Sequence, residues 1–236
     1  MLKAVLIPAV LAAAPAAANV TSYTENNLLL VIAHEVGHAF IREFDVPVLG
    51  NEETMADAFA LALLWREMPD RLPGIVTDRV RQMRFEQDEE SPFAEHPGDV
   101  WRAGQIVCLF YALDPQAHFD TAVTLGIGEY DGACADRGAE VARAWRRALA
   151  EQAMPDNARV TEVRIRADAA LQDTLGGNED LGQALFDLLA GIDWHSLITV
   201  SFADCGGDER ATWARNGRTI TICDGLIQRF ENEAPN

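Results

Sequence analysis

Two histidines near the amino terminus restrict the structures that this chain can adopt. His34 and His38 are four residues apart, so their imidazole rings project from one face if the segment is an α-helix. Apolar residues recur at helical spacing over residues 26–44 and predict such a helix. Two nitrogen ligands at this spacing suit one Zn²⁺ ion, and Glu35 can reach a water molecule bound to that ion.

A zinc ion that keeps one position open for a substrate needs a third protein ligand. Residues 40–49 contain no histidine, so the ligand is expected from the next predicted helix, residues 52–66. Glu53 and Asp57 share one face of that helix, so one can bind the metal while the other accepts a hydrogen bond from a ligand imidazole. Glu52 points about 100° away from Glu53 and is the competing candidate.

These residues resemble the gluzincins, the zinc peptidases whose third ligand is a glutamate. More narrowly, residues 49–57 are similar to a family of exported bacterial proteins that are proposed to be metallopeptidases and are known mainly as a domain of unknown function. The resemblance covers about residues 25–150. It implies one Zn²⁺ ion per chain, with His34, His38 and Glu53 as ligands, Glu35 as the general base and Asp57 behind a ligand imidazole.

The resemblance also extends beyond the metal ligands. A loop with His96, a helix with Cys108, then Cys134 and a final helix with Trp145 follow the order seen in that family. The run from His96 to Arg102 resembles one found beyond the ligands of membrane-bound gluzincins. Either residue can stabilise the oxyanion that forms on an attacked carbonyl group. The alternative is that His96 starts a helix and Arg102 belongs to a structural ion pair.

The first 18 residues have the pattern of a secretory signal peptide. A basic start at Lys3 precedes an apolar run, and small residues ending at Ala18 form a cleavage pattern. No later stretch is long and apolar enough to span a membrane, so the mature chain is expected in the periplasm or outside the cell. Four cysteines suit that compartment. Three pairings are possible, and we favour Cys108–Cys134 and Cys205–Cys223 because each pair brackets one local unit.

The charge balance narrows the range of partners. Lys and Arg number 19 and Asp and Glu number 37, which gives a net charge of −18. Such a surface repels nucleic acid. The resemblance to zinc peptidases implies a peptide or protein substrate. One alternative is an exported zinc-binding protein without activity, which acts structurally or through a protein partner. Glu35 argues against this alternative, because a purely structural zinc site does not need a carboxylate at that position. Such a site is also usually closed by a fourth protein ligand. A second alternative, a binding or inhibitory module for a basic partner, has only the charge to support it.

The order of the expected elements predicts an α+β fold that is mainly α. After the signal peptide, residues 19–155 are expected to form a helical, zincin-like core, and residues 156–236 a small α+β segment that completes the same domain. Asn216-Gly217 before an alternating run indicates a β-hairpin. Zincins usually place a sheet before the metal-site helix, and its edge strand holds the substrate. The hairpin between Cys205 and Cys223 comes last here, which would make the chain a circular permutation.

Overall fold

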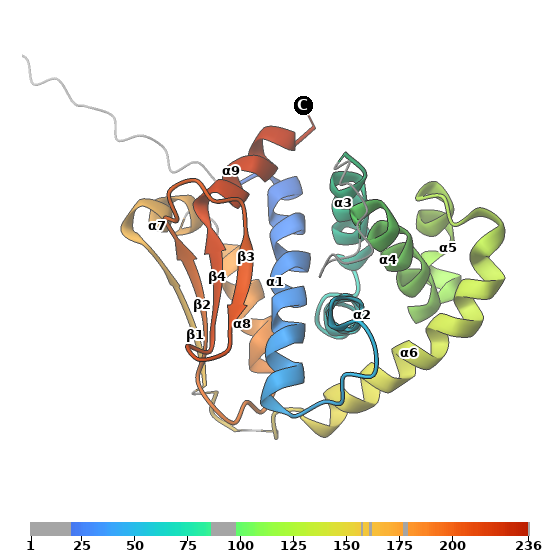
Figure 1. Cartoon of the computed structure of the whole chain (residues 1–236), viewed down its shortest axis with the longest axis horizontal. Helices are drawn as coiled ribbons and strands as arrows, with labels where there is room; N and C mark the ends of the chain where they lie inside the picture. Colours follow the sequence, from blue (N-terminus) through green and yellow to red (C-terminus); the bar gives the residue numbers. More distant parts are fainter. Residues whose placement is uncertain (1–19, 86–97, 157, 161, 177–178, 236) are drawn as a thin grey trace, which may run out of the picture.

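One long helix lies between two regions of different structure. The computed structural model describes residues 20–85, 98–156, 158–160, 162–176 and 179–235. Helix α1 (Ser22–Glu43) has a group of helices on one side and the sheet on the other (Figure 1). It ends where Asp45 adopts a left-handed conformation with φ of 50°, two residues before Pro47. Because both sides are covered, most of α1 is buried.

The helical region contains α2 (Glu52–Glu67), α3 (Leu72–Phe85), α4 (Asp99–Leu113), α5 (Pro115–Thr124) and α6 (Asp131–Glu151). Helices α2 and α3 pack against α1, and α4 packs against α3 and α6. Phe40 of α1 and Phe59 of α2 meet in the core with ring centroids 4.8 Å apart, and Trp145 of α6 lies 5.3 Å from Phe59. A disulfide between Cys108 and Cys134 joins α4 to α6.

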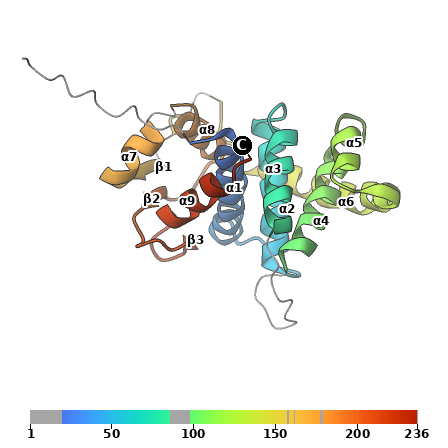
Figure 2. The same cartoon turned by 90° about the horizontal axis from the view of Figure 1, so that it is seen from above.

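The sheet region consists of β1 (Val163–Ala167), β2 (Ile198–Ala203), β3 (Ala211–Ala214) and β4 (Thr219–Cys223), with helices α7 (Ala169–Gly176), α8 (Glu179–Ala190) and α9 (Asp224–Glu233). The strand order is β1-β2-β4-β3; β1, β2 and β4 are parallel, and β3 is an antiparallel edge strand. Strand β3 lies beside α1, opposite α2 and α3 (Figure 2). A disulfide between Cys205 and Cys223 fastens the loop before β3 to the end of β4.

The predicted fold class is confirmed, since the described residues are mainly helical and carry one small sheet near the carboxyl terminus. Both favoured disulfides are present. Helices α5 and α7 were not predicted. Asp114-Pro115 ends α4 and also starts α5, because the Asp114 side chain accepts hydrogen bonds from the backbone N–H groups of Gln116 and Ala117. None of the described helices is long and apolar enough to cross a membrane.

Candidate metal centre

The site begins with an unusually close approach of α1 and α2. A Cβ atom on Gly37 would lie 3.0 Å from the Cα atom and 3.1 Å from the carbonyl oxygen of Ala56. Glycine in the interior of a helix costs about 1 kcal/mol relative to alanine. The close contact explains this choice, because a side chain at position 37 would push the two helices apart. Gly37 and Ala56 therefore bring the face of α2 that carries Glu53 next to the histidines of α1.

Three side chains converge at this crossing. Nε2 of His34 lies 3.1 Å from Oε2 of Glu53 and 3.1 Å from Nε2 of His38, and Nε2 of His38 lies 3.4 Å from Oε1 of Glu53. A tetrahedral zinc ion with bonds of about 2.0 to 2.1 Å separates its ligand atoms by about 3.3 Å. The spacing of the three residues therefore fits one metal ion without rearrangement, and these are the residues expected from the sequence.

A carboxylate behind each histidine sets the orientation of its ring. Nδ1 of His34 lies 2.7 Å from Oδ1 of Asp57, and Nδ1 of His38 lies 3.0 Å from Oε1 of Glu52. Because a carboxylate only accepts hydrogen bonds, each Nδ1 carries a proton, which leaves each Nε2 as the atom that can bind a metal ion beside Glu53. The group then needs positive charge between the Nε2 atoms and Glu53, supplied by a metal ion or by a second proton on a ring.

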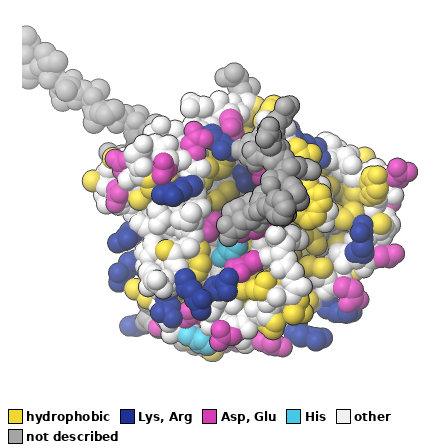
Figure 3. Space-filling model, viewed as in Figure 1, with side chains coloured by type: hydrophobic (Ala, Val, Ile, Leu, Met, Phe, Trp, Pro, Cys, Tyr) yellow, Lys and Arg dark blue, Asp and Glu magenta, His cyan; other side chains and the backbone are white. Residues whose placement is uncertain are grey.

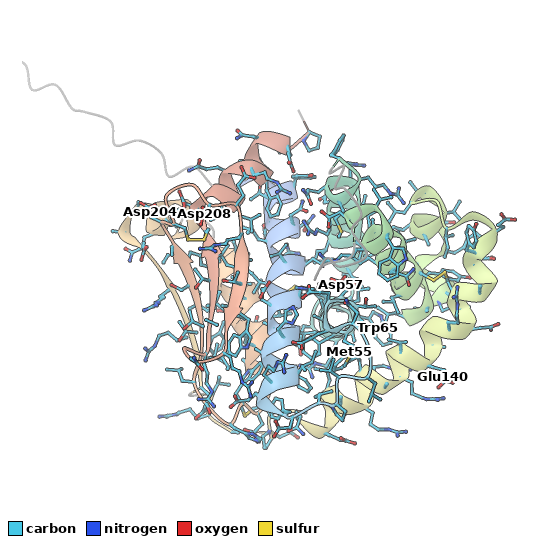
Figure 4. All side chains as sticks on the ribbon, in the orientation of Figure 1. Met55, Asp57, Trp65, Glu140, Asp204 and Asp208 are labelled. Atoms are coloured by element: carbon cyan, nitrogen blue, oxygen red, sulfur yellow. A yellow bond between two sulfur atoms is a disulfide. The ribbon has the colours of Figure 1, made fainter. Side chains whose placement is uncertain are left out.

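Asp57 and Glu52 hold the two rings in different surroundings. Asp57 is only 2% exposed, and it projects from α2 into the space between α1 and α4, on the opposite side of the helix from Met55 (Figure 4). Glu52 lies nearer the surface, where Arg42 binds its second oxygen. From the sequence, Glu52 is the competing candidate for the third ligand. The structure instead places it behind His38, a role that we did not predict because its spacing relative to Glu53 identifies no partner.

Arg102 is part of an ion pair in the structure. Its guanidinium group donates two hydrogen bonds to Asp57, at 3.0 Å from Nε and 2.8 Å from Nη2, and it lies 3.7 Å from a carboxylate oxygen of Asp99. The sequence left two roles open for Arg102, oxyanion stabilisation and a structural ion pair, and this arrangement is the structural ion pair. The guanidinium is directed at Asp57, behind His34, and Arg102 is absent from the cleft described below. His96 lies outside the described residues.

The electrostatics of the site favour positive charge between the carboxylates. Burial lowers the pKa of His34, but hydrogen bonds with Asp57 and Glu53 outweigh it and raise that pKa to about 9. Burial likewise opposes ionisation of Glu53 and Asp57, and their hydrogen bonds with His34 outweigh it, so both pKa values lie well below the usual range. In the metal-free protein, a second proton on the His34 ring supplies the positive charge that balances Glu53 and Asp57.

Glu35 is a buried carboxyl group beside the site. It is 8% exposed, and burial raises its pKa, although the nearby histidines and the backbone N–H of Trp213 on β3 favour its charged form. A carboxyl group with a raised pKa is closer to the range in which a general base both accepts and returns a proton near neutral pH. Glu35 therefore links the helix that carries the histidines to the edge strand of the sheet.

The site opens into a cleft with a volume of about 650 Å³. Its lining comes from α1, from the start of α2 and from the β3 strand with the turn that follows it, and includes Glu35, His38, Glu53, Trp213 and Arg215. The space-filling view shows histidine and acidic side chains in a hollow between the two regions, with basic side chains next to them (Figure 3). A volume of this size is typical of ligand-binding clefts. The open side of the metal group thus faces a space in which a substrate can lie.

Two histidines and a glutamate that fit one metal ion, next to a buried carboxyl group and an open cleft, define a candidate metalloprotein with room for a substrate. Residues 11–149 match the profile of the family described as "Putative metallopeptidase". The match covers more than half of the chain, and the chain belongs to this family. No curated protein and no solved structure matches the chain. The predicted resemblance to a family of proposed metallopeptidases is therefore confirmed.

Proposed function

We propose that the protein is an exported zinc-dependent peptidase that hydrolyses peptide bonds in its cleft. The observation that carries this proposal is the convergence of His34, His38 and Glu53 on one point whose open side meets Glu35 and the cleft. A mixed set of two imidazole nitrogens and one carboxylate oxygen suits zinc better than magnesium or calcium, which prefer oxygen ligands. Three protein ligands leave the position that a catalytic site requires.

A zinc ion bound there would polarise the substrate carbonyl group and lower the pKa of a water molecule. The protein supplies the remaining parts. Asp57 and Glu52 keep the Nε2 lone pairs of His34 and His38 directed at the site. Glu35 accepts the proton of the attacking water and delivers it to the nitrogen of the departing amine. The buried position of Glu35 and its raised pKa support this role.

We extend the proposal to the location and the organisation of the chain. The signal-peptide pattern of residues 1–18 supports export to the periplasm or the medium, and two disulfides suit an oxidising compartment. Residues 19–155 carry the metal ligands, and residues 156–236 provide the strand that forms the far wall of the cleft. We propose that the two parts form one domain, because the cleft needs both.

Metal removal and replacement tests the proposed activity. The mature chain would be freed of metal with a chelator and assayed on a mixed peptide library after addition of zinc, magnesium or calcium. We expect cleavage to disappear with chelation and to return with one equivalent of zinc but not with the other two ions. Cleavage that persists in the metal-free protein, or that magnesium alone restores, contradicts the proposal. Zinc binding without any cleavage supports a non-catalytic zinc protein instead.

A further inference from the structure

One arginine in the wall of the cleft has a different environment from the arginines around it. Arg42 is paired with Glu52, Arg218 with Glu43 and Arg210 with Asp208. Arg215 lines the same cleft as Glu35 and Glu53, and its side chain is exposed. Its side chain makes no ion pair or hydrogen bond with another residue that the structure describes. Its guanidinium group is therefore available to a molecule in the cleft.

The position of Arg215 follows from the geometry of the edge strand. Strand β3 pairs with β4 on one side only, and its other edge faces α1 and the cleft. Ala211, Thr212 and Trp213 of β3 line the cleft, and so does Arg215, which lies in the turn directly after the strand. Strand β3 and helix α1 run in the same direction, so Arg215 lies toward the carboxyl-terminal end of both (Figure 1). Arg42 also lines the cleft, and it lies closer to the carboxyl-terminal end of α1 than His34, Glu35 and His38 do.

The surrounding charges make a free arginine here informative. The chain has a net charge of −18, and Glu35 and Glu53 also line the cleft. A negatively charged group on a substrate is repelled by these carboxylates unless a cation compensates locally. Because Arg42 is neutralised by Glu52, Arg215 supplies that positive charge. A guanidinium group binds a carboxylate through two parallel hydrogen bonds, which an ammonium group cannot reproduce.

We propose that Arg215 recognises a carboxylate of the bound peptide, so that the protein prefers peptides that place a carboxylate at that end of the cleft. The proposal rests on the proposed peptidase function and specifies its substrate class. The carboxylate belongs either to an aspartate or glutamate side chain or to the carboxyl terminus of the peptide. Both present the same group to the arginine, and the experiment below separates them.

Peptide binding tests the proposal without relying on turnover. The host is the zinc-loaded mature chain with Glu35→Gln, which is expected to hold peptides without cleaving them. The ligands are fluorescein-labelled octapeptides of alanine and leucine that carry one glutamate or glutamine at a scanned position, each with a free or an amidated carboxyl terminus. Kd is measured by fluorescence anisotropy, with and without Arg215→Ala. The matched control is Arg164→Ala, an exposed arginine on β1, the opposite edge of the same sheet.

We expect one acidic series to bind about tenfold more tightly than its amide counterpart, as is typical of a hydrogen bond to a charged group. Arg215→Ala should remove this preference, and Arg164→Ala should keep it. A preference for glutamate over glutamine identifies a side-chain carboxylate, and a preference for the free terminus identifies the carboxyl terminus. If Arg215→Ala keeps the preference, or weakens the binding of charged and neutral peptides equally, the role assigned to Arg215 is wrong, but the peptidase function is not affected. If no peptide binds the zinc-loaded host, the peptidase function fails together with it.

Discussion

Helix α1 has two flanks, and each contributes to the site in a different way. On the α2 flank the contributions are side chains: two histidines meet three carboxylates within hydrogen-bond distance. On the β3 flank they are a backbone edge, the N–H of Trp213 directed at Glu35, and an exposed arginine. The first flank is built from one helix pair, whereas the second is brought in from far along the chain. We infer that metal binding depends on the first flank, and that substrate binding depends on the second.

The largest effect is expected from the loss of a metal ligand. Structural zinc sites contribute about 10 to 16 kcal/mol over four ligands, so Glu53→Ala should weaken zinc binding by about 3 kcal/mol or more. Glu52→Ala is the matched control, because it removes a neighbouring carboxylate that only orients His38. Its effect should stay within the roughly 10- to 100-fold typical of such partners. Competition with a chromogenic chelator measures both affinities, and a larger loss for Glu52→Ala would move the third ligand to that residue.

Opening one disulfide should separate the two flanks. Replacing both Cys205 and Cys223 by serine releases a loop closed by a sequence separation of 18, and it should lower the free energy of unfolding by about 3 kcal/mol. Zinc affinity of the folded protein should stay within a few-fold of wild type, while peptide cleavage falls because β3 loses its anchor. The same change at Cys108 and Cys134, which join α4 to α6, should destabilise the protein without this selective loss. Equal loss of zinc binding and cleavage in the first variant would contradict the separation.

The contact between α1 and α2 gives a smaller effect on stability. Gly37→Ala places a methyl group 3.0 Å from the backbone of Ala56, and overpacking of this kind costs about 1 to 3 kcal/mol. We expect a lower unfolding free energy and weaker zinc binding, because Glu53 moves away from the histidines. Gly104→Ala in α4 is the control, since no atom lies within 4 Å of its added Cβ. It should be neutral or stabilising by up to about 1 kcal/mol. Urea unfolding measures the unfolding free energy of both variants. Equal stability of the two variants would contradict the proposal that the close contact of α1 and α2 requires glycine at position 37.

Proton release provides the smallest signal. His34 has a pKa of about 9 in the metal-free protein, so it is protonated at pH 7.5, and a metal ion must displace that proton. Zinc affinity should therefore fall by about tenfold for each pH unit below 9 and level off above it. Titration calorimetry in buffers of different ionisation enthalpy should report the release of about one proton at pH 7.5. An affinity that does not change between pH 7 and 8 would show that His34 is neutral before the metal arrives.

The two flanks also differ in how far the sequence predicts them. Helical periodicity places His34 and His38 on one face of α1 and Glu53 and Asp57 on one face of α2, so local spacing supplies the candidates. The choice of Glu53 as the third ligand comes from the family resemblance. The contact between His38 and Glu52 does not follow from local spacing, because it depends on how the two helices cross at Gly37. The position of β3 beside α1 is a long-range contact that spacing within the chain cannot encode. The family match ends at residue 149, before the sheet begins, so the comparison with known proteins does not describe this flank either.

The measurement that tests the central claim most directly is zinc content together with peptide cleavage, in wild type and in Glu35→Gln. Both proteins would be prepared as the mature chain from an oxidising compartment and assayed on the same peptide library. We predict one zinc ion per chain in both, with cleavage reduced by about 10²- to 10⁴-fold in the variant, the usual contribution of a general base. Cleavage at the wild-type rate by a zinc-loaded Glu35→Gln protein would contradict the assignment of Glu35, and zinc without cleavage in both would contradict the peptidase function.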